Sequence, residues 1–231
     1  MVVASVHIAD VGVARALRML RGPRRVAGLA SAEVAVSAPL RGDGVSMPIP
    51  MPGRVALVAF WDDAVALDAF LADHPYGRRL GDGWWSRLDP LRAYGSWPGL
   101  PPDIERSRAV ASDGPTVVVT LGRLRLPRTR QFLRASRPAE AAALASTGFL
   151  WGTALARPPF VSTVSLWESA DAAVTYAYGA DPEAHTGAIA ADRTKGFHHQ
   201  SAFVRFRPTE VVGGLDGRNP LSEGLLQPVG G

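Results

Sequence analysis

The residues best suited to carry chemistry in this chain are its five histidines, His7, His74, His185, His198 and His199. Imidazole exchanges protons near neutral pH and is the commonest protein ligand of metal ions. The 231-residue chain has no cysteine, which excludes disulfides, thiolate catalysis, zinc–thiolate sites and a cysteine-ligated haem. It also lacks the Gly-x-Ser-x-Gly and Gly-x-x-x-x-Gly-Lys patterns, so neither a hydrolase nucleophile elbow nor a phosphate-binding loop is expected.

The elements that must position these residues are organised around a stretch that occurs twice, at residues 55–64 and 161–170. Its two tryptophans, Trp61 and Trp167, are 106 residues apart (167 − 61 = 106). The apolar and β-branched run before each tryptophan predicts a strand, and an amphipathic helix is predicted after it. Asp62 and Glu168 then place a negative charge at the start of each helix, where the helix dipole favours it. The repeat predicts a duplicated α+β module.

Each half of the chain predicts the order β-α-β-β-α-β, which is the ferredoxin-like order. The predicted strands cover residues 2–8, 26–36, 55–61, 84–94, 116–124, 148–155, 161–167 and 197–207. The predicted helices cover residues 11–20, 63–74, 75–80, 128–135, 139–146, 170–178 and 183–192. We therefore expect a first ferredoxin-like half at 1–97, a linker at 98–113, a second half at 114–208 and a Gly/Pro-rich tail at 209–231. Two such halves can close into an α+β barrel with helices outside and an apolar pocket inside.

The charge of the chain is carried almost entirely by arginine, because Lys195 is its only lysine and the net charge is +4. The arginines are densest at residues 15–25 and 123–137. The plain interpretation is solvated helix faces, and the alternative is docking of an acidic redox protein or an anionic membrane surface. No nucleic-acid motif accompanies the charge. Without a signal-peptide pattern or a long apolar run, a cytoplasmic protein is expected, with contact to a membrane surface as the alternative.

A series of segments stands out in order along the chain. The segments are Pro-Leu-Arg-Ala-Tyr-Gly-Ser-Trp-Pro-Gly at 90–99, Val-Ser-Thr-Val-Ser-Leu-Trp at 161–167, His185 followed by Gly196-Phe197, Phe-Val-Arg-Phe at 203–206 and Gly-Gly-Leu-Asp-Gly-Arg-Asn-Pro-Leu at 213–221. In order and spacing, from about Arg25 to Leu221, the chain resembles spheroidene monooxygenase. The resemblance implies a haem-dependent enzyme that uses dioxygen to oxidise an acyclic carotenoid to a ketocarotenoid, with electrons from a ferredoxin. The family's lysine-containing, glycine-rich element on the second strand of each half is missing at 29–33 and 151–157. The haem is therefore a firmer expectation than the carotenoid.

The resemblance also implies roles for individual residues. His185 is the expected axial ligand of the haem iron, with an exposed helix histidine as the alternative. Arg205 is expected to pair with a haem propionate if it points inward, and to be solvent-exposed otherwise. His198 and His199 are adjacent in a predicted strand, so one should face the barrel interior, as a proton donor to bound dioxygen, a fallback ligand or a hydrogen-bonded core histidine.

Arg92, Trp97 and Trp151 are expected to line the substrate pocket, although tryptophans more often belong to the core. His74, at a helix end, is expected to be structural, and His7 is assigned no function. Two other functions stay open at this point. One is a cofactor-free oxygenase of the antibiotic-biosynthesis type, and the other is a non-enzymatic barrel that binds haem or a lipid.

Overall fold

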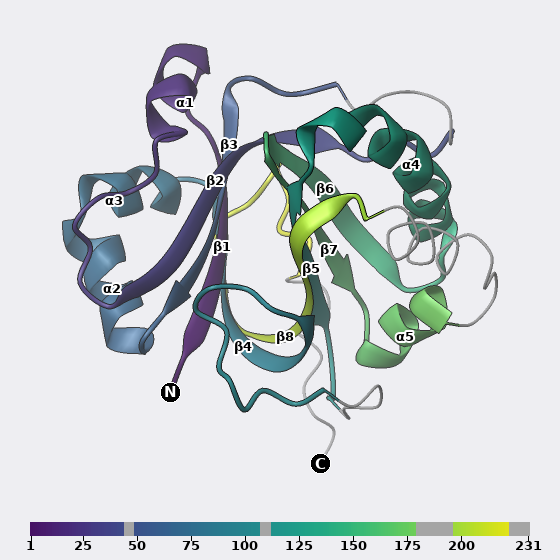
Figure 1. Cartoon of the computed structure of the whole chain (residues 1–231). Coiled ribbons are helices and arrows are strands. Elements are labelled where there is room, and N and C mark those ends of the chain that lie inside the picture. The colour runs from purple at the N-terminus through teal and green to yellow at the C-terminus, as the bar shows by residue number, and fades with distance from the viewer. Residues whose placement is uncertain (44–48, 107–111, 179–195, 222–231) are drawn as a thin grey trace.

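The computed structural model describes residues 1–43, 49–106, 112–178 and 196–221. Its strands form one closed barrel in the order β1-β3-β2-β6-β7-β5-β8-β4, and the helices lie outside it (Figure 1). Neighbouring strands pair antiparallel all the way around the barrel. The predicted α+β barrel is thereby confirmed. In the described ranges, no helix has the length and apolar character needed to cross a membrane.

The elements of the first half are β1 (Val3–Asp10), α1 (Val13–Met19), β2 (Leu29–Pro39), β3 (Arg54–Trp61), α2 (Ala64–Asp73), α3 (Pro75–Gly81) and β4 (Trp84–Gly95). Those of the second half are β5 (Thr116–Leu124), the 3-10 turn η1 (Leu126–Arg128), α4 (Thr129–Ala145), β6 (Phe149–Arg157), β7 (Phe160–Trp167), α5 (Ala170–Tyr178) and β8 (His198–Val212). The strands run in the order β4-β1-β3-β2 in the first half and β8-β5-β7-β6 in the second. Pairing of β2 with β6 and of β4 with β8 closes the barrel.

Some predicted elements differ from the structure, such as β2, which was predicted at 26–36 and lies at 29–39. The two helices expected at 128–135 and 139–146 form the single helix α4, which contains Pro138. Proline normally breaks a helix, but α4 continues through Pro138, and the Tyr176 hydroxyl donates to the carbonyl of the next residue, Ala139. β8 continues past the predicted boundary at Pro208 to Val212. The helix predicted at 183–192 lies outside the described residues.

The barrel interior is a packed apolar core to which all eight strands contribute. Its largest side chains include Phe60, Trp84 and Phe206, each almost completely buried. An eight-stranded barrel is just wide enough for its own side chains to fill. The apolar interior was predicted correctly, but in the described part of the chain it is occupied by these side chains, so the expected internal pocket is not found there.

The two tryptophans of the repeat end β3 and β7 and point outward against the helices. The Trp61 indole N–H donates to the Ser5 hydroxyl, and that of Trp167 donates to the Ser165 hydroxyl, both at 2.9 Å. Trp61 packs against Phe70 of α2 with ring centroids 4.9 Å apart. Trp167 stacks on Tyr176 of α5 at 5.0 Å. Each tryptophan therefore joins a strand end to the helix that follows it.

Candidate functional site

Two arginines lie side by side on the outer face of the barrel. Arg92 of β4 is the direct cross-strand partner of Arg205 of β8. The adjacent pair, Ala93 and Val204, belongs to the interior core. Because successive strand residues point to opposite faces, both arginines point away from the interior. Arg205 therefore does not point into the barrel, which was the condition attached to its expected role.

Both guanidinium groups are buried, with Arg92 7% and Arg205 6% exposed. Burial lowers the pKa of Arg205, and the positive charge of Arg92 lowers it further, while Tyr178 acts in the opposite direction. Nε of Arg92 is buried and has no hydrogen-bond partner among the described residues, and its Nη2 donates to the Arg106 carbonyl over 3.5 Å. An unsatisfied buried donor is costly. An anion placed here would receive hydrogen bonds and offset the repulsion between the two charges.

Neither His198 nor His199 has its ring in the barrel interior, so the prediction that one of them faces inward was wrong. The ladder between β5 and β8 has a register shift next to His198, where Leu124 pairs with His198 directly after Arg123 pairs with Gln200. This shift places the His198 ring on the outer face, directly over Gly122. A Cβ atom at position 122 would lie only 2.6 Å from the ring. Phe132 of α4 meets His198 edge-on at 5.1 Å. His199 is exposed.

The expected pocket residues Arg92, Trp97 and Trp151 are not brought together. Trp97 is buried at the end of the barrel where β4 finishes, and it packs against Phe160 with ring centroids 5.9 Å apart. Trp151 lies at the opposite end and packs against Trp84 at 6.3 Å. Arg92 is on the outer face between these ends. The barrel therefore separates the three, with the two tryptophans at opposite ends and Arg92 on the outer face between them.

Each end of the barrel carries a polar cluster that the sequence did not reveal. At the Trp97 end, Glu33 is almost buried and pairs with Arg123 at 2.7 Å and Arg157 at 2.8 Å. The Arg123 guanidinium also lies 4.6 Å from the centroid of the Trp97 ring. These residues come from β2, β5 and β6, so only closure of the barrel makes them neighbours. They form an ion cluster in which the carboxylate is nearly buried and the two arginine side chains are partly exposed.

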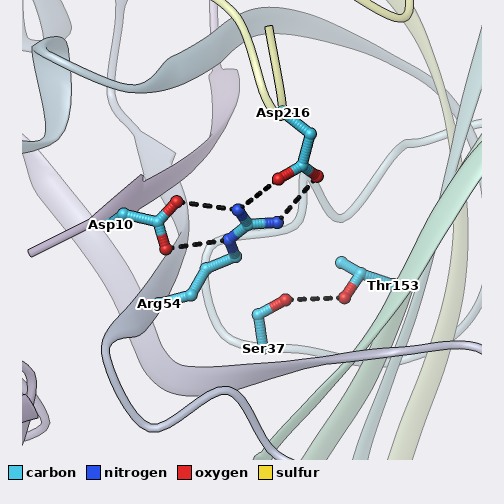
Figure 2. A network of polar contacts seen from close by, with 5 residues as sticks. All are labelled: Asp10, Ser37, Arg54, Thr153 and Asp216. Atoms are coloured by element: carbon cyan, nitrogen blue, oxygen red, sulfur yellow. Dashed lines mark hydrogen bonds and ion pairs between the residues drawn. The ribbon is translucent and has the colours of Figure 1, made fainter. Parts of the chain in front are cut away.

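At the other end, Arg54 joins the start of β3 to the chain after β8 (Figure 2). It donates to both carboxylate oxygens of Asp10, at 3.0 and 2.7 Å, and to both of Asp216, also at 3.0 and 2.7 Å. These bonds raise the pKa of Arg54 and lower that of Asp216. Ser37 and Thr153 hydroxyls meet nearby at 2.7 Å across the β2–β6 seam. The role of this cluster is to hold the barrel end closed.

Three histidines remain: one lies outside the described residues, and the other two are buried or cap a helix. His185 lies outside the described residues, so its predicted role as iron ligand stays a prediction. His74 caps α3 by accepting the Tyr76 backbone N–H at Nδ1. His7 is fully buried against Trp85, and desolvation lowers its pKa to about 3. Within the described ranges, no group of three or more His, Asp or Glu side chains could hold a metal ion.

The outer face of β4, β5 and β8 can be tested for its fit to a haem. The buried, unsatisfied Nε of Arg92 beside Arg205 suits a carboxylate such as a propionate. His198 lies seven positions from Arg205 (205 − 198 = 7), which is about 23 Å along a strand. His198 is therefore too far away to be the ligand of a haem iron held at the arginines. The arginine pair fits the propionates of a haem, and His185, the ligand that the resemblance implies, lies outside the described residues.

No protein-family model matches the chain, and no curated protein matches it. Among solved structures, it is similar to an aldoxime dehydratase in complex with butyraldoxime (10% identity over 90% of this chain and 79% of that chain, TM-score 0.44). It is also similar to a monooxygenase-like protein from Listeria innocua (12%, 87% and 92%, TM-score 0.31) and to a haem-degrading enzyme from Listeria monocytogenes (13%, 87% and 98%, TM-score 0.31). Likeness at this level carries no inference about activity.

Proposed function

We propose that this protein is a haem-dependent oxygenase of the spheroidene monooxygenase type that acts on an apolar, carotenoid-like substrate. The observation that supports it is the pair of buried guanidinium groups of Arg92 and Arg205 on the outer face of β4 and β8, where Nε of Arg92 has no hydrogen-bond partner among the described residues. A dianionic, otherwise apolar group matches this combination of paired positive charge and low exposure. The order of family-like segments along the sequence supplies the class of reaction.

In this proposal, the two arginines and His185 have defined tasks. Arg92 and Arg205 would bind the two propionates, and His185 would be the ligand of the haem iron. Bound haem supplies the dioxygen activation, and the protein orients the substrate and excludes water. His198 lies on the same outer face, held between Gly122 and Phe132, but its distance of about 23 Å along the strand from Arg205 leaves it without a task on a haem bound at the arginines. A ferredoxin-type protein would supply electrons.

We also propose that the barrel consists of two copies of one ferredoxin-like module. The equal strand order of the halves supports this, as do the matching contacts of Trp61 with Phe70 and of Trp167 with Tyr176, each in the helix that follows the tryptophan. A second equivalence is found at the turns before β2 and β6. Gly28 accepts the N–H of Asp62 at 2.9 Å, and Gly148 accepts that of Glu168 at 2.8 Å. An added Cβ at these glycines would lie 2.4 Å from Ala66 and 2.7 Å from Ala172, respectively.

Haemin titration of the purified protein, followed by absorption spectroscopy, tests the proposal. We expect stoichiometric binding with a Soret band, and a loss of that band at equal haemin concentration in His185→Ala. Arg92→Ala should weaken binding about tenfold or more, because a hydrogen bond to a charged group contributes about 1.5–3 kcal/mol. Matched controls are His199→Ala and Arg207→Ala, which change an exposed imidazole and an exposed guanidinium paired with Asp89.

The other possible functions give different results in the same experiments. A protein that takes up no haemin but consumes dioxygen with an electron-rich substrate is a cofactor-free oxygenase. A protein that binds haemin or lipid but consumes no dioxygen with reductant and a polyene is a carrier. A Soret band that persists at full strength in His185→Ala removes the ligand assignment, while leaving the arginine pair to be judged by Arg92→Ala.

A further inference from the structure

The segment around α1 concentrates positive charge on one corner of the molecule. Residues 11–32 contain five arginines and no acidic residue. These arginines are all exposed, and their side chains make no ion pair or hydrogen bond within the described part of the chain. They are Arg15, Arg18, Arg21, Arg24 and Arg25. α1 projects outward from the barrel at this corner (Figure 1). The charge is thus available to a partner.

The same helix exposes apolar side chains. Leu17 is 61% and Val13 51% exposed, whereas Ala16 and Met19 are buried against the barrel. Val13 and Leu17 are four residues apart, so they lie on one side of the helix. A helix that buries one apolar side and exposes another, flanked by arginine, is typical of segments that lie in a membrane interface.

Between α1 and α3 lies an open cavity of about 290 Å³. Three guanidinium groups, those of Arg15, Arg18 and Arg79, line it together with His74 and Tyr76. No carboxylate is among its lining residues. Guanidinium groups bind phosphate oxygens in pairs of parallel hydrogen bonds. The cavity therefore has the charge and donors to receive a phosphate-bearing headgroup beside the exposed apolar side chains.

We propose that α1 and the arginine segment at 15–25 dock the protein on an anionic lipid bilayer. Leu17 and Val13 enter the interface, and the cavity of Arg15, Arg18 and Arg79 receives a lipid phosphate. Charge complementarity selects this partner over a neutral membrane, and the exposed leucine and valine select it over a soluble polyanion. This inference rests on the surface alone and is independent of the proposed haem function.

Vesicle flotation of the full chain tests the proposal, with phosphatidylcholine vesicles and vesicles containing 30% phosphatidylglycerol, an amount on the order of that in anionic biological membranes. We expect binding to the anionic vesicles only, and weaker binding as salt rises. Each arginine near a membrane surface contributes about fivefold in partitioning. Arg15→Ala/Arg18→Ala should therefore lower the partition coefficient about thirtyfold. The charge-matched control Arg130→Ala/Arg134→Ala, on α4, should lower it far less.

The apolar contribution has its own pair of variants. Leu17→Asp should abolish vesicle binding, and Leu126→Asp, at an equally exposed leucine in η1, should retain it. Circular dichroism and thermal unfolding establish that both variants fold. Equal binding to neutral and anionic vesicles, or equal losses in the α1 and α4 variants, would overturn the proposal. The proposal would also be overturned if the protein were retained on a polyglutamate column but bound no vesicles.

Discussion

Trp61 and Trp167 each donate the indole N–H to a serine hydroxyl at 2.9 Å, Trp61 to Ser5 of the neighbouring strand β1 and Trp167 to Ser165 of its own strand β7. Both rings are buried, and each packs against an aromatic side chain of the helix that follows. We therefore expect Trp61→Phe and Trp167→Phe to lower the free energy of unfolding by similar amounts, about 2 kcal/mol each. Urea unfolding provides the measurement. Trp151→Phe, at a half-buried tryptophan without such a bond, should lower the free energy of unfolding clearly less. A large loss at only one of Trp61 and Trp167 would contradict the prediction.

Arg92 is expected to be unfavourable for folding in the absence of a bound anion. Its guanidinium is buried beside that of Arg205, with Nε unsatisfied. Arg92→Met keeps most of the side-chain length and removes the charge, so the haem-free protein should become more stable, by about 1 kcal/mol. Haemin affinity should fall in the same variant. Thermal unfolding with and without haemin separates the two effects.

The control for this prediction is Arg207→Met, which removes an exposed guanidinium from the same strand. It should leave both stability and haemin affinity nearly unchanged. If Arg92→Met instead destabilises the haem-free protein, the guanidinium stabilises the fold, and the prediction is wrong.

His7 should make the protein less stable in mild acid. It is fully buried, and its pKa is about 3 in the folded protein, against 6.5 in the unfolded chain. As pH falls below 6.5, His7 therefore binds a proton in the unfolded chain but not in the folded protein. The contribution of neutral His7 is complete above pH 6.5 and is lost progressively between pH 6.5 and about 3.

Linkage gives a loss of about 2 kcal/mol between pH 7 and pH 5. His7→Phe, which cannot titrate, should flatten the pH dependence of the free energy of unfolding by that amount, measured by urea unfolding at both pH values. His199→Gln, at an exposed imidazole, should leave the slope as it is. An unchanged slope in His7→Phe would show that the buried ring is not the source.

The contact between Arg54 and Asp216 should protect the chain that follows β8. Asp216 lies in the turn closed by the pairing of Leu215 with Arg218, and Leu215 is buried in the barrel core. Asp216→Asn weakens a mostly exposed ion pair, an effect of about 1 kcal/mol. Opening of the segment should become about fivefold more frequent. Trypsin should then cleave after the exposed Arg218 about fivefold faster, because cleavage follows the population of the open form.

Asp89→Asn removes a comparable exposed ion pair, that with Arg207, away from this segment. It should not change cleavage after Arg218. Because Arg54 lowers the pKa of Asp216, the protection should also be lost in the parent protein as pH falls below the usual carboxyl range. Equal cleavage rates in the parent and in Asp216→Asn would show that the hydrophobic contacts of Leu215 and Leu221 hold the segment by themselves.

The sequence by itself determined the elements and their class. Apolar and β-branched runs placed the strands of both halves, and β5 and α5 have the predicted bounds, because strand and helix preferences are local properties of the chain. The repeated Trp-ended stretch correctly marked the ends of β3 and β7. Local pattern failed where tertiary contacts outweigh propensity, as at Pro138 inside α4.

Tertiary structure alone decided which residues share a site. Barrel closure brings Arg92 beside Arg205 and Glu33 beside Arg123, pairs that are 113 and 90 residues apart (205 − 92 and 123 − 33). It also moves Trp97 and Trp151 to opposite ends of the barrel, and a register shift turns His198 to the outer face. Strand register and closure depend on pairing between distant segments, so no local pattern in the sequence encodes them.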